Sequence, residues 1–139
     1  MFSHITLGIA DPDRALAFYR PLTEALGLIE KFAAREDGRF WAGYVRPDAP
    51  RPLFILTQPW DGAAAAPGNG TMVAFQLETR AEVDRLHALA LALGGADEGP
   101  PGLRTQYHAD YYGGYLRDPD GNKLCLVCHA PPPTGSTSR

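Results

Sequence analysis

The sequence predicts an α+β fold made of two similar βαβββ modules, and three observations support this prediction. The chain contains an internal repeat with a spacing of 68 residues, the distance from His4 to Met72. Both copies begin with alternating apolar and polar residues, as half-buried strands do, and continue with apolar residues at helical spacing. Both copies also place a helix-capping residue at the matching position, Asp11 in the first and Thr79 in the second.

The first module is predicted to cover about residues 1–60. Its opening strand precedes a helix near Asp13–Leu26, because Pro12 suits the first helical position and Gly27 offers a C-terminal stop. Pro21 is expected to bend or shorten this helix, since proline removes one backbone hydrogen bond. Two further strand-like segments follow, at about Gly38–Val45 and Leu53–Thr57.

The second module is predicted to cover about residues 70–130. Its helix is expected near Arg80–Leu93, because Thr79 and Glu82 form a capping box at its start. The helix is expected to end at Gly95, the repeat mate of the glycine that ends the first helix. Two strand-like segments follow, at about Tyr111–Arg117 and Lys123–Cys128, joined by a turn at Asp118–Gly121.

Length and composition indicate one globular domain. The chain has 139 residues, of which 45% are hydrophobic and 21% charged, a profile typical of a domain with its own core. We therefore predict a single domain over residues 1–130, with the segment DGAAAAPGNG linking the modules. Residues 131–139 are rich in proline and polar residues, and we expect them to form a flexible tail.

The charge and hydropathy of the chain exclude several classes of partner. The net charge of −3 shows no excess of basic residues of the kind that binds nucleic acid. No apolar run approaches the roughly 18 residues that a membrane-spanning helix needs. The start of the chain also lacks the pattern of a signal peptide, so we expect a cytoplasmic protein.

The two cysteines, Cys125 and Cys128, form a CxxC segment within a predicted strand. Residues three apart in a strand project from opposite faces, so these thiols are not expected to share a metal or form a disulfide. A redox CxxC also needs a helix N-terminus to lower one thiol pKa, and this segment offers none. We expect Cys125 to act as a small buried apolar residue.

Three segments of the chain resemble the vicinal oxygen chelate superfamily, which includes glyoxalase I, bleomycin-resistance proteins and extradiol dioxygenases. They are HITLGIADPDRALAFY, GNGTMVAFQL and YYGGYLRDPDGNKL. The resemblance implies that the modules form an open, trough-like barrel of mixed β-sheet with the helices outside, frequently in a homodimer. It does not identify a reaction, because the superfamily includes isomerases, lyases, dioxygenases and metal-free binders.

The resemblance also implies where a metal would be held. Metalloenzymes of the superfamily place four ligands in the trough, and by motif these positions fall on His4, Ile55, Met72 and Cys125, with Thr57 as the alternative to Ile55. Only His4 is a good ligand for zinc, iron or manganese, because Ile55 has no donor atom and sulfur replaces the remaining imidazole and carboxylate. We expect no metal and no other cofactor. A divalent metal held by an atypical set that includes His4 is the alternative.

A trough without metal can still bind a small molecule. The segment LRTQYHADYYGGY combines an arginine, a histidine and several tyrosines, which suit contacts with an organic ligand. His4 and His108 are the candidate groups for metal-free acid–base catalysis. His87 on the second helix and His129 after the last strand are expected to be solvated. We expect ligand contacts from Thr6, Ile55, Thr57, Met72, Gln76, Arg104, Tyr111, Tyr112 and Cys125.

Two classes of function compete on these residues. The first is a metal-free binder of a small aromatic or apolar compound, which the missing carboxylate favours. The second is an enzyme, either metal-free or a metal-dependent lyase, isomerase or dioxygenase that uses His4. A dimer with a purely structural role is a weaker third option. In each case we expect a homodimer, because the resemblance implies that modules pair between chains.

Overall fold

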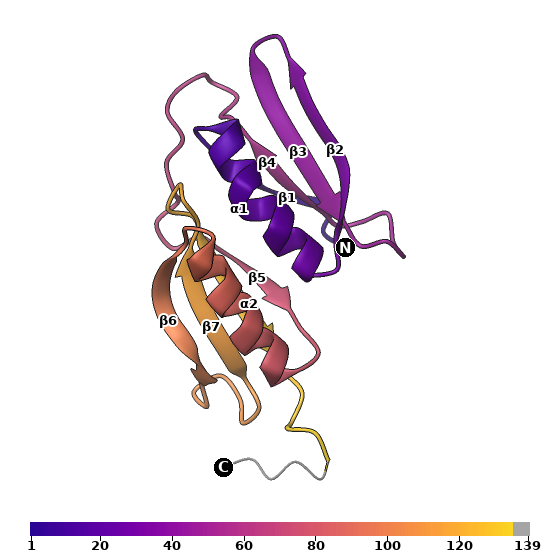
Figure 1. Cartoon of the computed structure of the whole chain (residues 1–139), viewed down its shortest axis with the longest axis vertical. Helices are drawn as coiled ribbons and strands as arrows, with labels where there is room; N and C mark the ends of the chain where they lie inside the picture. Colours follow the sequence, from indigo (N-terminus) through magenta and orange to yellow (C-terminus); the bar gives the residue numbers. More distant parts are fainter. Residues whose placement is uncertain (135–139) are drawn as a thin grey trace.

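The computed structural model describes residues 1–134 and contains two modules with the same order of elements (Figure 1). Five elements form the first module: β1 (His4–Gly8), α1 (Pro12–Ala25), β2 (Ile29–Glu36), β3 (Arg39–Val45) and β4 (Leu53–Thr57). Five elements form the second: β5 (Met72–Gln76), α2 (Arg80–Ala92), β6 (Ala96–Leu103), β7 (Tyr112–Arg117) and β8 (Lys123–Cys128). Of the predicted tail at 131–139, residues 135–139 lie outside the described part.

Each module forms one four-stranded mixed sheet, and the two sheets have the same topology. The strand orders are β1-β4-β3-β2 and β5-β8-β7-β6. In both sheets the first pair is parallel and the other two pairs are antiparallel. The register repeats as well, since His4 lies opposite Leu53 and Met72 lies opposite Lys123. The predicted α+β fold of two βαβββ modules is confirmed.

The core of each module lies between its helix and one face of its sheet. In the first module Phe18, Tyr19 and Leu22 of α1 are fully buried, and in the second Val83 and Leu86 of α2 are. Alternate residues of the strands complete each core, because neighbouring strand residues point to opposite faces. Each sheet therefore has one face covered by its helix and a second, which we call the open face. Both helices lie on the same side of the molecule (Figure 1), so both open faces point to the other side.

The turn between β7 and β8 joins the two modules. The Tyr19 hydroxyl of α1 donates to the Asp118 carboxylate over 2.5 Å, and Asn122 Nδ2 donates to the Gly8 carbonyl over 2.9 Å. Asp120 accepts from the backbone N–H of Ala10, also over 2.9 Å. Asp118 and Asn122 are both buried, which makes this polar junction part of the core. It fixes the positions of the two open faces relative to each other.

Two strands and one helix end differ from the prediction. The prediction did not name β2 or β6; β6 contains Pro100, Pro101 and two register shifts, which an edge strand tolerates. Helix α1 continues through Pro21 to Ala25 and is not shortened, because Leu22 packs in the core and the Thr23 hydroxyl donates to a backbone carbonyl one turn earlier.

The second helix ends one residue earlier than the repeat predicts. Gly94, with a φ of +112°, takes the left-handed conformation that ends the helix, so the prediction of Gly95 is wrong. The two helices begin at matching positions of the repeat, Pro12 and Arg80, but α2 has 13 residues whereas α1 has 14. No helix among residues 1–134 is long and apolar enough to cross a membrane.

Candidate functional site

The open face of the first module carries four of the predicted site residues. His4 and Thr6 of β1 are exposed, and Ile55 and Thr57 of the neighbouring β4 are half-buried. The Nδ1 atom of His4 lies 2.9 Å from the Ser3 hydroxyl, so one ring nitrogen of this exposed side chain has a local partner. This face therefore offers one imidazole among small and aliphatic side chains.

The open face of the second module carries the equivalent residues of the repeat. Met72 and Gln76 of β5 are exposed, whereas Cys125 of the neighbouring β8 is fully buried. In the register of the two strands Ala74 lies opposite Cys125, and Met72, two residues before Ala74, points to the same face. In the first module Thr6 lies opposite Ile55, and His4, two residues before Thr6, points to the same face.

Two tyrosines cover the Cys125 thiol. The Tyr111 hydroxyl lies 3.6 Å from the Cys125 sulfur and 2.9 Å from the Tyr115 hydroxyl. Burial raises the pKa of the Cys125 thiol above its ordinary value, so the thiol stays protonated near neutral pH. Burial also raises the pKa of both tyrosines, helped for Tyr111 by its hydrogen bond to Tyr115. The three groups therefore form a neutral hydrogen-bonded chain.

Two cations flank this neutral chain. The Arg104 guanidinium carbon lies 5.5 Å from the centre of the Tyr115 ring, and the Lys123 ammonium lies 5.3 Å from the same point. Arg104 Nη2 also donates to the Pro100 carbonyl over 2.7 Å. Across residues 1–134, neither cation has a carboxylate within ion-pair distance. The open face of the second module is thus positively charged and aromatic.

Two of the predicted site residues lie away from this group. Tyr112 belongs to the helix-covered face, where its hydroxyl donates to Asp84 of α2 over 2.6 Å; burial and that carboxylate raise the pKa of Tyr112 to about 12. His108 is exposed at the loop before β7, where its Nε2 atom lies 2.8 Å from Nδ1 of His129. Because neighbouring strand residues alternate in direction, Tyr112 and Tyr111 are separated by the sheet.

His87 is placed differently from the prediction. It was expected to be a solvated residue of the second helix, but its side chain is buried and its Nε2 atom lies 3.1 Å from the Tyr115 carbonyl. The same nitrogen lies 3.2 Å from a carboxylate oxygen of Asp97. His87 therefore links α2 to β6 and β7 on the helix-covered face of the sheet.

The residues at the four metal positions of the superfamily do not fit a divalent metal. Within the described part of the chain, no three side chains of His, Cys, Asp and Glu lie close enough together to hold an ion. Ile55 has no donor atom, and Cys125 is a buried neutral thiol rather than a thiolate. The donor chemistry of this chain thus differs from that of the metalloenzymes.

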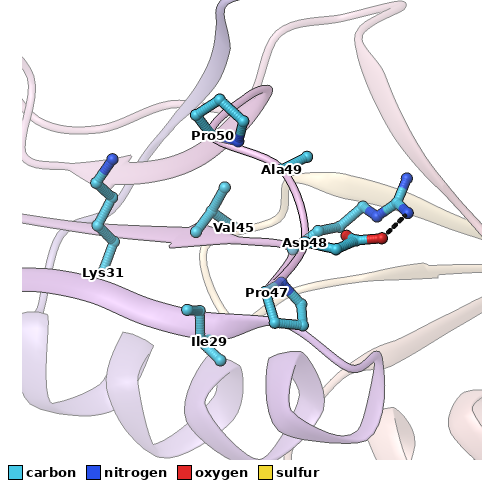
Figure 2. A pocket seen from close by; sticks show the side chains of 8 residues that line it. Ile29, Lys31, Val45, Pro47, Asp48, Ala49 and Pro50 are labelled. Atoms are coloured by element: carbon cyan, nitrogen blue, oxygen red, sulfur yellow. Dashed lines mark hydrogen bonds and ion pairs between the residues drawn. The ribbon is translucent and has the colours of Figure 1, made fainter.

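A cavity of about 1010 Å³ lies between the modules, and its lining includes Tyr44, Phe54, Phe75 and two residues of the open face of β5, Ala74 and the predicted site residue Gln76. A smaller hollow of about 410 Å³ lies beside the β3–β4 loop (Figure 2). Its one arginine already pairs with Asp48 over 2.8 Å, so it offers no group of convergent polar side chains.

The sequence prediction left out three residues of the open face. Lys123 stands two residues before Cys125 in the same strand, and this period-2 spacing was sufficient to place both on one face. Tyr115 and Tyr107 were visible as part of a tyrosine-rich segment, but their contacts depend on how the loop folds. Tyr107 packs on Tyr111 with 4.8 Å between ring centres.

The comparisons with known proteins agree with the fold. The chain matches the model of the Glyoxalase/Bleomycin resistance protein/Dioxygenase superfamily over residues 1–126. It belongs to this superfamily, as the resemblance of its three segments implied. Among curated proteins, no relative matches the chain.

Several solved structures resemble the chain over nearly its whole length. A glyoxalase/bleomycin resistance protein from Albidiferax ferrireducens T118 is 35% identical, with a TM-score of 0.76, and the match covers 94% of this chain and 99% of that one. A glyoxalase-related enzyme from Fulvimarina pelagi is 23% identical, with a TM-score of 0.69 and coverage of 92% and 87%. A domain of the same superfamily from Frankia sp. EAN1pec is 22% identical, with a TM-score of 0.70 and coverage of 94% and 98%. The last two support the fold alone.

Proposed function

We propose that this protein binds a small organic molecule on its open faces, in the trough between modules, without the usual metal of the superfamily. The observation that carries the proposal is the state of Cys125. At the position where the resemblance implies a ligating carboxylate, this chain has a fully buried, neutral thiol under Tyr111. A ligand above it would meet aromatic rings and a few polar groups, as in most small-molecule sites.

A second copy of the chain would complete the trough. The open face of the first module exposes His4 and Thr6, and that of the second exposes Met72 and Gln76. We propose a homodimer in which each open face is covered by an open face of the partner chain, because an uncovered ligand would lose most of its contacts. The two free cysteines fit a reducing compartment, which supports a cytoplasmic location.

An enzyme with an atypical site is the second candidate. It is favoured by His4, an accessible imidazole on the same surface, with His108 as a second titratable group at the loop. In this candidate His4 either transfers protons without metal or contributes to a divalent-metal site of a lyase, isomerase or dioxygenase. The donor set around it argues against the metal-dependent form.

The test is a thermal-shift screen of small aromatic and apolar compounds, with calorimetry on those that stabilise the protein. Ala74→Trp should abolish binding, because Ala74 is exposed on the open face directly opposite Cys125. Ala88→Trp, on the exposed side of α2, is the matched control and should bind normally. Binding that survives Ala74→Trp would place the ligand away from this face and away from the adjoining cavity, whose lining includes Ala74.

A further inference from the structure

Arg104, Lys123 and Tyr115 are brought together by the strand register. Tyr115 of β7 lies opposite Cys125 of β8 on one side and opposite Gly99 of β6 on the other. Lys123 is two residues before Cys125, so it shares the open face, and Arg104 follows directly after β6. The two cations therefore approach the Tyr115 ring from the strands on its two sides.

Two glycines make room for the Arg104 side chain. A Cβ atom at Gly102 would lie 3.0 Å from Nη1 of Arg104, and one at Gly99 would lie 3.4 Å from Nη2. The Gly99 position would also bring a Cβ to 3.3 Å from the Tyr115 ring. Together with the hydrogen bond to the Pro100 carbonyl, this space holds the guanidinium beside Tyr115 rather than free in solvent.

The two positive charges are not compensated within the described residues. The neighbouring carboxylate, Glu98, is already paired with Arg117 over 2.8 Å. Cys125, Tyr111 and Tyr115 all have a raised pKa because of burial, so they carry no negative charge near neutral pH. Two uncompensated, partly buried positive charges beside the same ring attract an anion.

Neutral tyrosines also provide donors for that anion. The thiol, the Tyr111 hydroxyl and the Tyr115 hydroxyl lie in sequence at 3.6 and 2.9 Å. In the arrangement where Cys125 donates to Tyr111 and Tyr111 donates to Tyr115, the Tyr115 O–H remains free for a further acceptor. Tyr107 is 62% exposed and packs on Tyr111, so its ring is free to contact an apolar group.

From this geometry we propose that Arg104 and Lys123 bind the carboxylate of a small aromatic acid, whose ring packs against Tyr107 and Tyr111. This inference rests on the proposed function, because it names the class of ligand that the trough takes. A planar guanidinium suits a carboxylate, which accepts two parallel N–H donors. Tyr115 lies between the two cations and donates its hydroxyl to the same group.

The test is calorimetry with matched acids and amides: benzoate against benzamide, phenylacetate against phenylacetamide, and inorganic phosphate. Each acid should bind at least about tenfold more tightly than its amide, the effect of one charge-assisted contact. Raising the salt concentration should weaken binding of the acids and leave the amides unchanged. This salt comparison needs no variant.

Variants then assign the effect to the two cations. Arg104→Gln and Lys123→Gln should each remove the preference for acids, whereas Arg85→Gln and Lys31→Gln, at exposed positions on α2 and β2, should keep it. Equal binding of acids and amides would overturn the carboxylate inference and leave the proposed function standing. Tighter binding of phosphate would also overturn it, and binding of no aromatic compound would overturn both.

Discussion

Replacing Tyr19 by phenylalanine tests the junction that positions the two open faces. Tyr19 is fully buried, and its hydroxyl donates to Asp118 over 2.5 Å from a helix in the other module. The change removes one hydroxyl oxygen and leaves the ring and its packing in place. It therefore isolates the hydrogen bond between the modules.

The expected loss of unfolding free energy is about 1.5–3 kcal/mol, the contribution of a hydrogen bond to a charged group. The lower part of that range applies, because Asp118 keeps three other donors: the backbone N–H of Asp120 and of Asn122, and the Asn122 amide. Those donors prevent the buried carboxylate from being left without partners.

The pH dependence provides a second signature of the same contact. Burial and the neighbouring Asp118 raise the pKa of Tyr19 well above its ordinary value. A group whose pKa is raised on folding contributes stability below its unfolded pKa of about 10 and loses it as pH rises further. The unmodified protein should therefore lose stability above about pH 10 more steeply than Tyr19→Phe does.

Urea denaturation followed by fluorescence measures both effects. Tyr107→Phe is the matched control, because Tyr107 is exposed and its hydroxyl has no hydrogen-bond partner among residues 1–134; it should change stability by less than about 0.5 kcal/mol. A Tyr19→Phe variant as stable as this control, with an unchanged alkaline profile, would refute the role of the Tyr19–Asp118 contact.

Three further predictions concern the sites described above. His87→Ala should cost about 1–3 kcal/mol, measured by urea denaturation, because it leaves the Tyr115 carbonyl without its partner. Cys125 should react with iodoacetamide at neutral pH only after unfolding, as mass spectrometry would detect, since it is buried and its pKa is raised. Light scattering at micromolar concentration should give twice the 15.1 kDa of one chain; a monomer would contradict the proposed dimer.

Periodicity and caps were enough to predict the repeat and both helices, because each helix packs one apolar stripe on a sheet. The same reasoning did not predict β6, because its prolines and glycines break the alternating pattern that is typical of a strand. The strand forms because it pairs with β7. It also misplaced His87, because a polar residue next to an apolar stripe becomes buried only when a partner such as Asp97 is nearby.

The candidate site was predicted in outline and not in detail. Alternation along the strands placed His4 and Cys125 on open faces, and the tyrosine-rich segment indicated the region. The approach of Arg104 and Lys123 to Tyr115 depends on how β6, β7 and β8 pair with one another. Such a contact follows from the register of the sheet, which a single sequence does not specify.

The most direct test of a binder without the usual metal is a calorimetric titration of the freshly purified protein with zinc, nickel and manganese. We predict no stoichiometric binding to the unmodified chain, and binding to the double variant Met72→His, Cys125→Glu, strengthened by adding Ile55→Glu. Met72 and Cys125 lie on one face of the paired strands β5 and β8, and their replacements would supply the imidazole and carboxylate that these metals prefer. Zinc or iron bound by the unmodified protein at one ion per chain, and lost in His4→Ala, would contradict the account.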